Sequence, residues 1–332
     1  MKVLYVLAAA AMVFSSFNLY AQCTDGDCTN GKGKFLFTNK AVYEGEFKGG
    51  KMTGRGVYVD QKGDRYEGEF TDGKLNGKGK VNYKNGESAE GNYKDNLLEG
   101  KGVIVSKTGD KYTGDFKKGK KEGKGEFIYA SGEKYSGIFS KDEFNGEGTF
   151  NYKNVSSYKG NFVEGKPNGT GTFTDANGDT FSGNFKNGKI NGNGKAVFKN
   201  GSHYEGNFID SVMSGQGSFT DDKGNMYVGD FKNGKLNGKG KVTFSNGEIF
   251  EGDFVNDLLN GKGKHISKTG AVYEGMFKNH KYNGKGEYTQ PNKIKYAGDF
   301  KDGKPHGNGA LYRPDGTEAQ KGKFVEGKFQ EK

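Results

Sequence analysis

The stretches "YEGEFTDGKLNGKGKV" at residues 66–81 and "YVGDFKNGKLNGKGKV" at residues 227–242 are almost the same sequence. Their first residues lie 161 positions apart, which is seven times 23. Units of this length follow one another without insertion or deletion, and they begin at Tyr43, Tyr66, Ala89, Tyr112, Tyr135, Tyr158, Phe181, Tyr204, Tyr227, Phe250, Tyr273 and Tyr296. Twelve in-phase units indicate one tandem repeat rather than a protein with two related sites.

Each unit carries glycines and an aromatic residue at fixed places. Counting the first residue of a unit as position 0, glycine occupies positions +2, +11 and +13 in all twelve units, and an aromatic residue occupies +4. Positions 0, +2 and +4 alternate with polar residues, as do +11, +13 and +15, which is the period of a β-strand. Pairs such as Asp72-Gly73, Asn187-Gly188 and Asn233-Gly234 predict a tight turn between the two strands. Every unit is therefore predicted to be a β-hairpin.

Glycine in the middle of a strand usually weakens a sheet, so three such glycines in each unit need a reason. Our interpretation is steric: a missing side chain leaves a flat seat on which a neighbouring Tyr or Phe ring can lie. The residues at positions 0, +2 and +4 are then the core of the repeat. They are represented by Tyr43, Gly45, Phe47, Tyr66, Gly68, Phe70, Tyr227, Gly229 and Phe231.

The ends of the repeat region are incomplete units. A single hairpin cannot bury its rings, but neighbouring hairpins can, so such repeats form arrays with protected ends. "GKGKFLF" and "QKGKF" each match one strand of the unit, and we expect half-repeat caps at residues 31–42 and 319–332. Twelve full units occupy residues 43–318. The predicted fold is all-β: an elongated array of antiparallel β-hairpins.

The first residues have a different composition from the repeats. Lys2 precedes an apolar run that ends at Phe14, and Ala21 offers a cleavage point, so residues 1–21 are predicted to be a secretory signal peptide. The apolar run is shorter than the roughly 20 residues that a membrane anchor needs. Lipoprotein processing at Cys23 is disfavoured because Gln22 precedes it. We therefore expect export, to the periplasm, the cell surface or the medium.

Residues 22–30 form a short segment that contains both cysteines of the chain. Cys23 and Cys28 lie in "CTDGDC", and an exported protein favours a disulfide between them, although two free thiols are the alternative. Asp25 and Asp27 could suggest a cation loop, but no further ligands follow at the spacing of a calcium loop.

The 23-residue pattern Y-x-G-x-F-x-x-G-K-x-x-G-x-G-x-F resembles the MORN repeat (membrane occupation and recognition nexus) from about Gly31 to Phe324. The chain looks like an exported, bacterial-type member built of repeats only, with Phe or Tyr at +4 where Trp is common. The resemblance implies an extended β-sheet array that serves in interaction, sometimes at acidic lipids.

Little sequence lies outside the repeats and the signal peptide, so catalysis would have to reside on the repeats. The histidines His203, His265, His280 and His306 occupy four different repeat positions and form no column. His265 replaces an aromatic residue at +15 and is best explained as a packed ring. The "GKG" triplets lack the remainder of a phosphate-binding loop. We predict no enzyme, no catalytic or metal-ligating residues and no cofactor.

Two functions remain. The first is a structural or interaction scaffold of the cell envelope or exterior that binds protein partners along its sheet. The second is a module for anionic lipid, lipopolysaccharide or glycan, because 51 Lys and Arg outnumber 41 Asp and Glu. Nucleic acid fits the charge but not the expected compartment. The candidate contacts are the lysines at +8, which the hairpin model places at the tips: Lys51, Lys74, Lys120, Lys166, Lys189, Lys235, Lys281 and Lys304.

Charged residues suggest how the two strands of a hairpin face each other. An acid at +3 accompanies a base at +12 in the pairs Glu46/Arg55, Glu69/Lys78, Asp115/Lys124, Asp230/Lys239 and Asp253/Lys262. If these are cross-strand pairs within one hairpin, then positions that sum to fifteen face each other. The turn is then predicted to be centred on +7 and +8.

Overall fold

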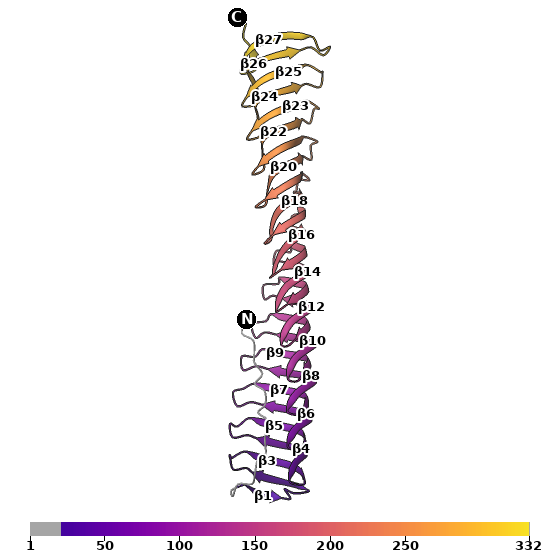
Figure 1. Ribbon diagram of the computed structural model, residues 1–332, viewed down its shortest axis with the longest axis vertical. Coiled ribbons are helices and arrows are strands. Elements are labelled where there is room, and N and C mark those ends of the chain that lie inside the picture. Colours follow the sequence, from indigo (N-terminus) through magenta and orange to yellow (C-terminus); the bar gives the residue numbers. More distant parts are fainter. Residues whose placement is uncertain (1–20, 332) are drawn as a thin grey trace. The chain divides into compact units, whose positions relative to one another are not determined.

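The computed structural model describes residues 21–331, and this range contains strands but no helix, and so no helical segment able to cross a bilayer. The predicted signal peptide, apart from Ala21, lies outside the described residues. The chain divides into two compact structural units, each made of many 23-residue repeats: the first is Met1–Asn168 and the second is Gly169–Lys332. Each structural unit is described by itself, and "first unit" and "second unit" refer to these halves from here on. Within each unit, consecutive strands pair antiparallel (Figure 1).

The first unit contains β1 to β13, and β14 (Lys166–Thr174) runs across the boundary. Its strands are β1 (Gln22–Gly26), β2 (Lys32–Leu36), β3 (Val42–Lys48), β4 (Lys51–Val59), β5 (Arg65–Thr71), β6 (Lys74–Asn82), β7 (Ser88–Lys94), β8 (Leu97–Val105), β9 (Lys111–Lys117), β10 (Lys120–Ile128), β11 (Lys134–Ser140), β12 (Glu143–Asn151) and β13 (Ser157–Val163).

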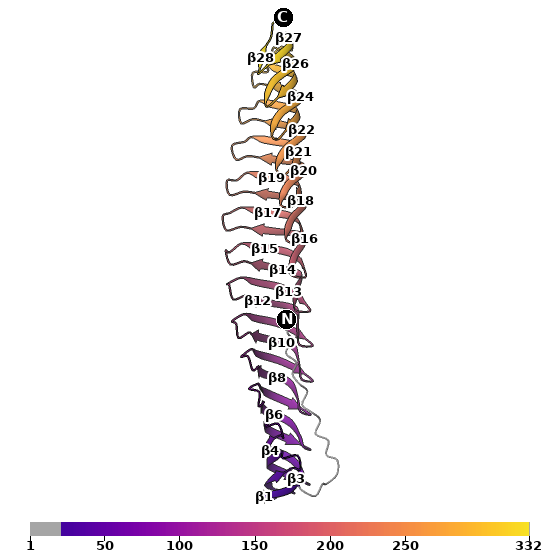
Figure 2. The same cartoon turned by 90° about the vertical axis from the view of Figure 1, so that its left-hand side faces the viewer.

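The second unit continues the same pattern. Its strands are β15 (Thr180–Lys186), β16 (Lys189–Val197), β17 (His203–Ile209), β18 (Val212–Thr220), β19 (Met226–Lys232), β20 (Lys235–Thr243), β21 (Ile249–Val255), β22 (Leu258–Ile266), β23 (Val272–Lys278), β24 (Lys281–Thr289), β25 (Lys295–Lys301), β26 (Lys304–Tyr312), β27 (Glu318–Val325) and β28 (Lys328–Phe329). In each unit the two-residue turns line one edge and the longer connections the other (Figure 2). The predicted all-β array of antiparallel hairpins is confirmed.

The hairpin turns lie one position earlier than the charge pattern predicted. Lys186 pairs with Lys189, so Asn187 and Gly188, at +6 and +7, form the turn. Both residues have positive φ, 51° and 84°, as a type I′ turn requires. The prediction of a turn centred on +7 and +8 is therefore wrong, although the Asn-Gly and Asp-Gly signals marked the correct dipeptides.

The pairing changes register inside each hairpin. In β5 and β6, Gly68 faces Gly79, as the sum of fifteen predicts, but Phe70 faces Leu75, a sum of thirteen. The second strand therefore holds two extra residues between these pairs, which form a bulge. Gly77, at +11, lies in this bulge with φ +113°, and a Cβ there would meet the side chain of Glu69 rather than a ring. The glycine at +11 thus serves the backbone. The glycines at +2 and +13 do form a seat, but in this hairpin the side chain that lies on it is Leu75 and not an aromatic ring.

The core is a layer of rings on one face of the sheet. Tyr43 is fully buried, and its ring lies over Gly56, the +13 glycine of the same hairpin. Its hydroxyl donates to the carbonyl oxygens of Glu46 (3.2 Å) and Thr53 (3.1 Å). The same ring meets Phe47 of its own hairpin and Phe70 of the next, edge to face, with centroids 5.2 Å apart in both cases. Tyr43 therefore joins two hairpins, and the same pair of ring contacts occurs at Tyr112, Tyr135, Tyr204, Tyr273 and Tyr296. In other repeats the side chain over the +13 glycine is a leucine or isoleucine from +9: Leu75, Ile190, Leu236 and Leu259.

The buried hydroxyls remain protonated at ordinary pH. Burial raises the pKa of Tyr204 to about 12, and the hydroxyl donates to the carbonyl oxygen of Asn207 at 3.0 Å. Tyr43 and Tyr135 have the same arrangement, and burial also raises their pKa to about 12. The phenols thus act as neutral donors that satisfy backbone carbonyls at the bend of these hairpins.

The outermost strands lie outside the full repeats: β1 in the segment 22–30 that contains both cysteines, and β28 in the predicted half-repeat cap 319–332. At the start, β1 pairs with β2, and Cys23 and Cys28 form a disulfide that ties β1 to the segment leading into β2. At the other end, β27 pairs with the two-residue strand β28, and Phe329 packs on Phe324 with ring centroids 5.3 Å apart. Short strands of this kind leave little free edge for another chain to pair with.

One core position holds a charge. Position +9 is buried and apolar in most hairpins, but in β10 it is Lys121, which is 3% exposed. Its Nζ lies between the rings of Tyr112 and Phe127, 5.7 Å and 5.6 Å from their centroids, and 3.9 Å from Asp142 Oδ1. Burial lowers the pKa of Lys121, and Asp142 only partly opposes that shift.

Substituting Gly217 with Val should destabilise the second unit by about 2 kcal/mol, because the new side chain would overpack the core. A Cβ at Gly217 would lie 2.5 Å from Cε2 and Cζ of Tyr204. The matched control is Gln216→Val, on the exposed face of the same strand, which should change stability by no more than about 0.5 kcal/mol. Denaturant unfolding of both variants measures the difference, and equal midpoints would show that this glycine is not a packing seat.

Substituting Lys121 with Met should stabilise the first unit by about 1 kcal/mol at neutral pH, because a buried amine is replaced by an apolar side chain of similar size. The lowered pKa means that the unfolded chain binds more protons than the folded chain at pH values between that pKa and 10.5. Wild-type stability should therefore rise with pH across this window, and the variant should lack that rise. Urea unfolding at pH 7 and pH 9.5 tests both statements; identical pH dependence in the two proteins contradicts them.

Candidate functional site

The face opposite the rings carries the charged side chains of positions +1, +3, +12 and +14. Lysines at +14 face glutamates at +1 of the following hairpin, as in Lys80–Glu90 at 3.4 Å and Lys264–Glu274 at 3.7 Å. Both partners are largely exposed, so each pair contributes at most about 1 kcal/mol. The pairs align neighbouring hairpins and leave this face close to charge balance.

The acids at +3 pair with bases of the preceding hairpin, not of their own. Lys101 faces Asp115 across β8 and β9, with Nζ 2.7 Å from the carboxylate, and Lys239 meets Asp253 across β20 and β21 at 2.6 Å. Within its own hairpin, Asp115 accepts a hydrogen bond from the backbone N–H of Lys124 at 3.2 Å. The predicted pairing within one hairpin is therefore wrong, because the bulge moves +12 out of register with +3.

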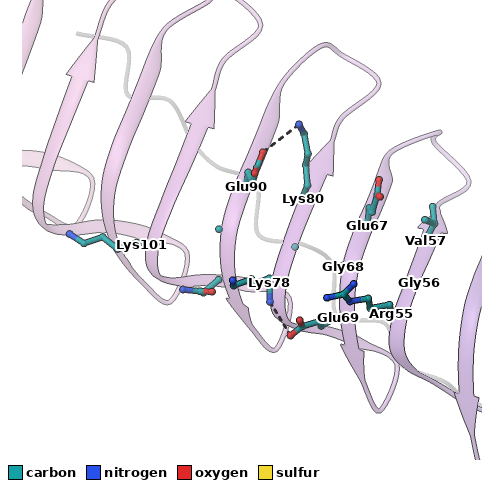
Figure 3. A pocket seen from close by; sticks show the side chains of 13 residues that line it. Arg55, Gly56, Val57, Glu67, Gly68, Glu69, Lys78, Lys80, Glu90 and Lys101 are labelled. Carbon is teal, nitrogen blue, oxygen red and sulfur yellow. Dashed lines mark hydrogen bonds and ion pairs between the residues drawn. The ribbon is translucent and has the colours of Figure 1, made fainter.

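A groove of about 870 Å³ lies on this face of the first unit (Figure 3). The backbone of the glycines at +2 and +13, such as Gly68 and Gly79, forms its floor. Charged residues of both signs line it: Arg55, Glu67, Glu69, Lys78, Lys80, Glu90 and Lys101. Figure 3 shows Lys80 bound to Glu90 on one side of the glycine floor and the backbone of Lys78 bound to Glu69 on the other.

Lys78 is the cation of the groove with least compensation. The residue across the strand from it is Asn92, whereas Arg55 faces Glu69 and Lys101 faces Asp115. No ion pair of Lys78 occurs in the described part of the chain. The groove therefore combines neutralised charge pairs with one free ammonium group.

All eight predicted lysines begin the second strand of a hairpin, directly after the turn. Four of them bind an acid in the next turn: Lys51 meets Asp72 at 3.1 Å, Lys74 meets Asp95 at 2.9 Å, Lys189 meets Asp210 at 3.8 Å and Lys304 meets Glu326 at 2.9 Å. Between residues 21 and 331 no ion pair involves Lys120, Lys235 or Lys281. Half of the predicted cationic edge is thus locally neutralised, and its role as an anionic-surface site stays a prediction.

Sequence reasoning missed the residues that face these lysines. In the second unit, Lys186 faces Lys189, Lys232 faces Lys235, Lys278 faces Lys281 and Lys301 faces Lys304. The two intervening hairpins have apolar pairs instead, Ile209 with Val212 and Val255 with Leu258, and these four side chains are 42–63% exposed. The lysines and apolar residues at positions +5 and +8 are visible in the sequence. They can be recognised as facing pairs only when the turn is placed at +6 and +7.

His265 is a packed ring with polar partners. It stacks on Phe250 with centroids 4.1 Å apart, and its two nitrogens meet the hydroxyl of Tyr282 at 2.5 Å and the carboxylate of Glu248 at 2.7 Å. Within the described residues, no group of three His, Cys, Asp or Glu side chains is arranged to hold a metal ion.

A family model described as MORN repeat matches the chain in twelve segments: 43–65, 66–88, 90–111, 112–134, 135–154, 158–180, 181–203, 204–226, 227–249, 250–272, 273–294 and 296–318. The chain belongs to the MORN repeat family. The matched segments agree with the twelve units deduced from the 23-residue period. The MORN unit of this chain is thus one hairpin followed by its connection to the next.

Comparison with curated proteins and with solved structures adds no functional assignment to the MORN family match. The sequence matches none of the curated proteins with which it was compared. Among solved structures, the TCP10 domain of Danio rerio CPAP in complex with a peptide of Danio rerio STIL is 12% identical, with a TM-score of 0.34 over 81% of this chain and 98% of that one. The SAS-4 (dCPAP) TCP domain of Drosophila melanogaster, with a proline-rich motif of Ana2 (dSTIL), is 13% identical, with a TM-score of 0.32 over 47% of this chain and 85% of that one. These TM-scores are too low to support an inference about function.

Proposed function

We propose that this MORN protein is a non-enzymatic scaffold, and that the groove of the first unit binds an extended protein segment that carries both acidic and basic side chains. The observation that carries the proposal is the groove itself, with a glycine floor that allows close approach and charges of both signs along it. Such a surface favours a partner of complementary charge pattern over a uniformly charged one.

The mode of binding follows from the sheet. Interior strands have neighbours on both sides, and the array ends in β1 and in the very short β28, so addition of a partner strand is disfavoured. The partner is expected to lie on the face of the sheet and to make side-chain contacts.

We include export in the proposal, because of the apolar run before Ala21. Mass spectrometry of exported protein should find Gln22 at the N-terminus, and a retained Met1 would contradict export.

The groove is tested by double charge reversal. A photo-crosslinking residue at Val57, which lines the groove, identifies the partner, and calorimetry with the purified partner then gives its affinity. Arg55→Glu with Lys78→Glu should weaken binding by tenfold or more, about 1.4 kcal/mol. The control, Lys94→Glu with Lys117→Glu, changes the net charge equally but lies at hairpin tips outside the groove, and it should change affinity less than about twofold. Equal losses in the two variants would show that net charge, not the groove, determines binding.

A second function is favoured by the tips of the second unit. Like charges directly opposite each other on a sheet are destabilising, yet four hairpins there place lysine against lysine. The exposed apolar pairs Ile209 with Val212 and Val255 with Leu258 alternate with the lysine pairs of the first three of these hairpins. Alternating cationic and apolar tips suit the interface of an anionic lipid or lipopolysaccharide surface, with a glycan as the purely polar alternative.

The tip surface is tested with vesicles. Substituting the eight predicted lysines with Gln should abolish co-sedimentation with vesicles that contain anionic lipid, because each lysine contributes about 1 kcal/mol near such a surface. Substituting Ile209, Val212, Val255 and Leu258 with Ser should weaken binding at moderate salt, where charge is screened and apolar insertion is not. Failure of the wild type to bind at low salt, or full binding by the Gln variant, would contradict membrane binding by the tips. The scaffold would then be the one function that the observations support.

A further inference from the structure

Some hairpins are fastened to the preceding hairpin by a side chain in the turn. The residue at +7 accepts a hydrogen bond from the backbone N–H at +9 of the preceding hairpin, an arrangement we call the turn clasp. Its four members are Asn96 with Leu75 (2.8 Å), Asp142 with Lys121 (2.9 Å), Asp257 with Leu236 (2.7 Å) and His280 with Leu259 (2.8 Å). In each, the +7 N–H also donates to the +9 carbonyl oxygen, as between His280 and Leu259 at 2.9 Å.

His280 is the member whose acceptor titrates closest to neutral pH. The clasp uses the Nδ1 atom, which accepts a hydrogen bond only while it carries no proton. The other three clasps use an amide or carboxylate oxygen, and the amide oxygen of Asn96 accepts a hydrogen bond at any ordinary pH. Protonation of His280 would set an N–H donor against the N–H donor of Leu259.

The surroundings of His280 do not offer the protonated ring a free carboxylate. The ring lies against Phe250 and Phe254, with centroid distances of 4.9 Å and 6.1 Å. The charges of His265 and Glu248 act on the ring, and the carboxylate of Glu248 is already bound to Nε2 of His265 at 2.7 Å.

Charged residues also lie beside His280 in its own hairpin and in the preceding turn. Lys278 and Lys281 flank it on its own hairpin, and Asp257 in the preceding turn accepts its bond from Leu236. Burial, and then the charge of His265, lower the pKa of His280, with Glu248 opposing the shift.

We propose that the clasp between His280 and Leu259 is an acid-sensitive junction, which holds hairpin β23–β24 to hairpin β21–β22 at neutral pH and releases it on acidification. A group whose pKa is lowered by folding contributes stability that is present above its ordinary value of 6.5 and is lost as the pH falls through the lowered value. Acidification therefore loosens this junction, while the junction made by the amide of Asn96, which does not titrate, stays closed. This property is independent of the groove and of the tip surface.

Hydrogen exchange of the Leu259 amide measures the clasp directly. In the full chain, protection of this amide, corrected for the intrinsic exchange rate, should fall about tenfold between pH 7.5 and pH 5, the scale of one lost hydrogen bond. The amide of Leu75, which donates to Asn96 in the equivalent clasp, should keep its protection. His280→Asn restores the amide acceptor used by Asn96, and in this variant Leu259 should stay protected at both pH values.

Two results overturn the proposal. The first is a wild-type Leu259 amide that stays equally protected although NMR titration shows the His280 ring becoming protonated. The second is an equal loss of protection in His280→Asn, which would assign the acid response to another group, such as His265.

Discussion

The structure depends on the pair of glycines that face each other at +2 and +13, against which a position-0 tyrosine ring lies in some repeats and a leucine or isoleucine from +9 in others. In the first MORN unit a Cβ on Gly45 would meet the Cα of Gly56, and a Cβ on Gly56 would meet the ring of Tyr43. Only glycine lets the ring lie against the backbone, where its hydroxyl reaches two carbonyl oxygens at the bend. The ring then meets an aromatic residue of the next hairpin, so a local contact also sets how hairpins stack.

The charged face follows from this arrangement. Since the rings occupy one face, polar side chains gather on the other, and the bulge beside the glycine pair displaces the second strand by two residues. Asp115 shows the result: it accepts the backbone N–H of Lys124 in its own hairpin and binds the ammonium group of Lys101 in the preceding one. One carboxylate thereby closes the bulge and joins two hairpins. The groove forms where such residues flank bare glycine backbone.

Departures from the repeat occur where a column accepts a different residue of similar size. Lys121 enters the apolar +9 column and His265 the aromatic +15 column, and each finds a carboxylate, in Asp142 and Glu248. His280 replaces an Asn or Asp acceptor in a turn. Strictly periodic positions therefore maintain the fold, and substituted positions give individual hairpins their own chemistry. A binding surface built on such an array can differ from one hairpin to the next without a change of backbone.

The sequence by itself determined the 23-residue unit, its two strands, the face that holds the rings and the dipeptides that turn, because each of these depends on residues a few positions apart. It could not determine which acid meets which base. In a periodic chain, each +3 acid such as Asp115 recurs at one fixed spacing from the base of its own hairpin, Lys124, and at another from the base of the preceding hairpin, Lys101, and the bulge decided between them. The opposed lysines at the tips could be recognised only once the position of the turn was known. The groove is formed by several aligned hairpins together, and the His280 clasp depends on contact between one turn and the strand before it. These features arise from register between hairpins, which only the tertiary structure decided.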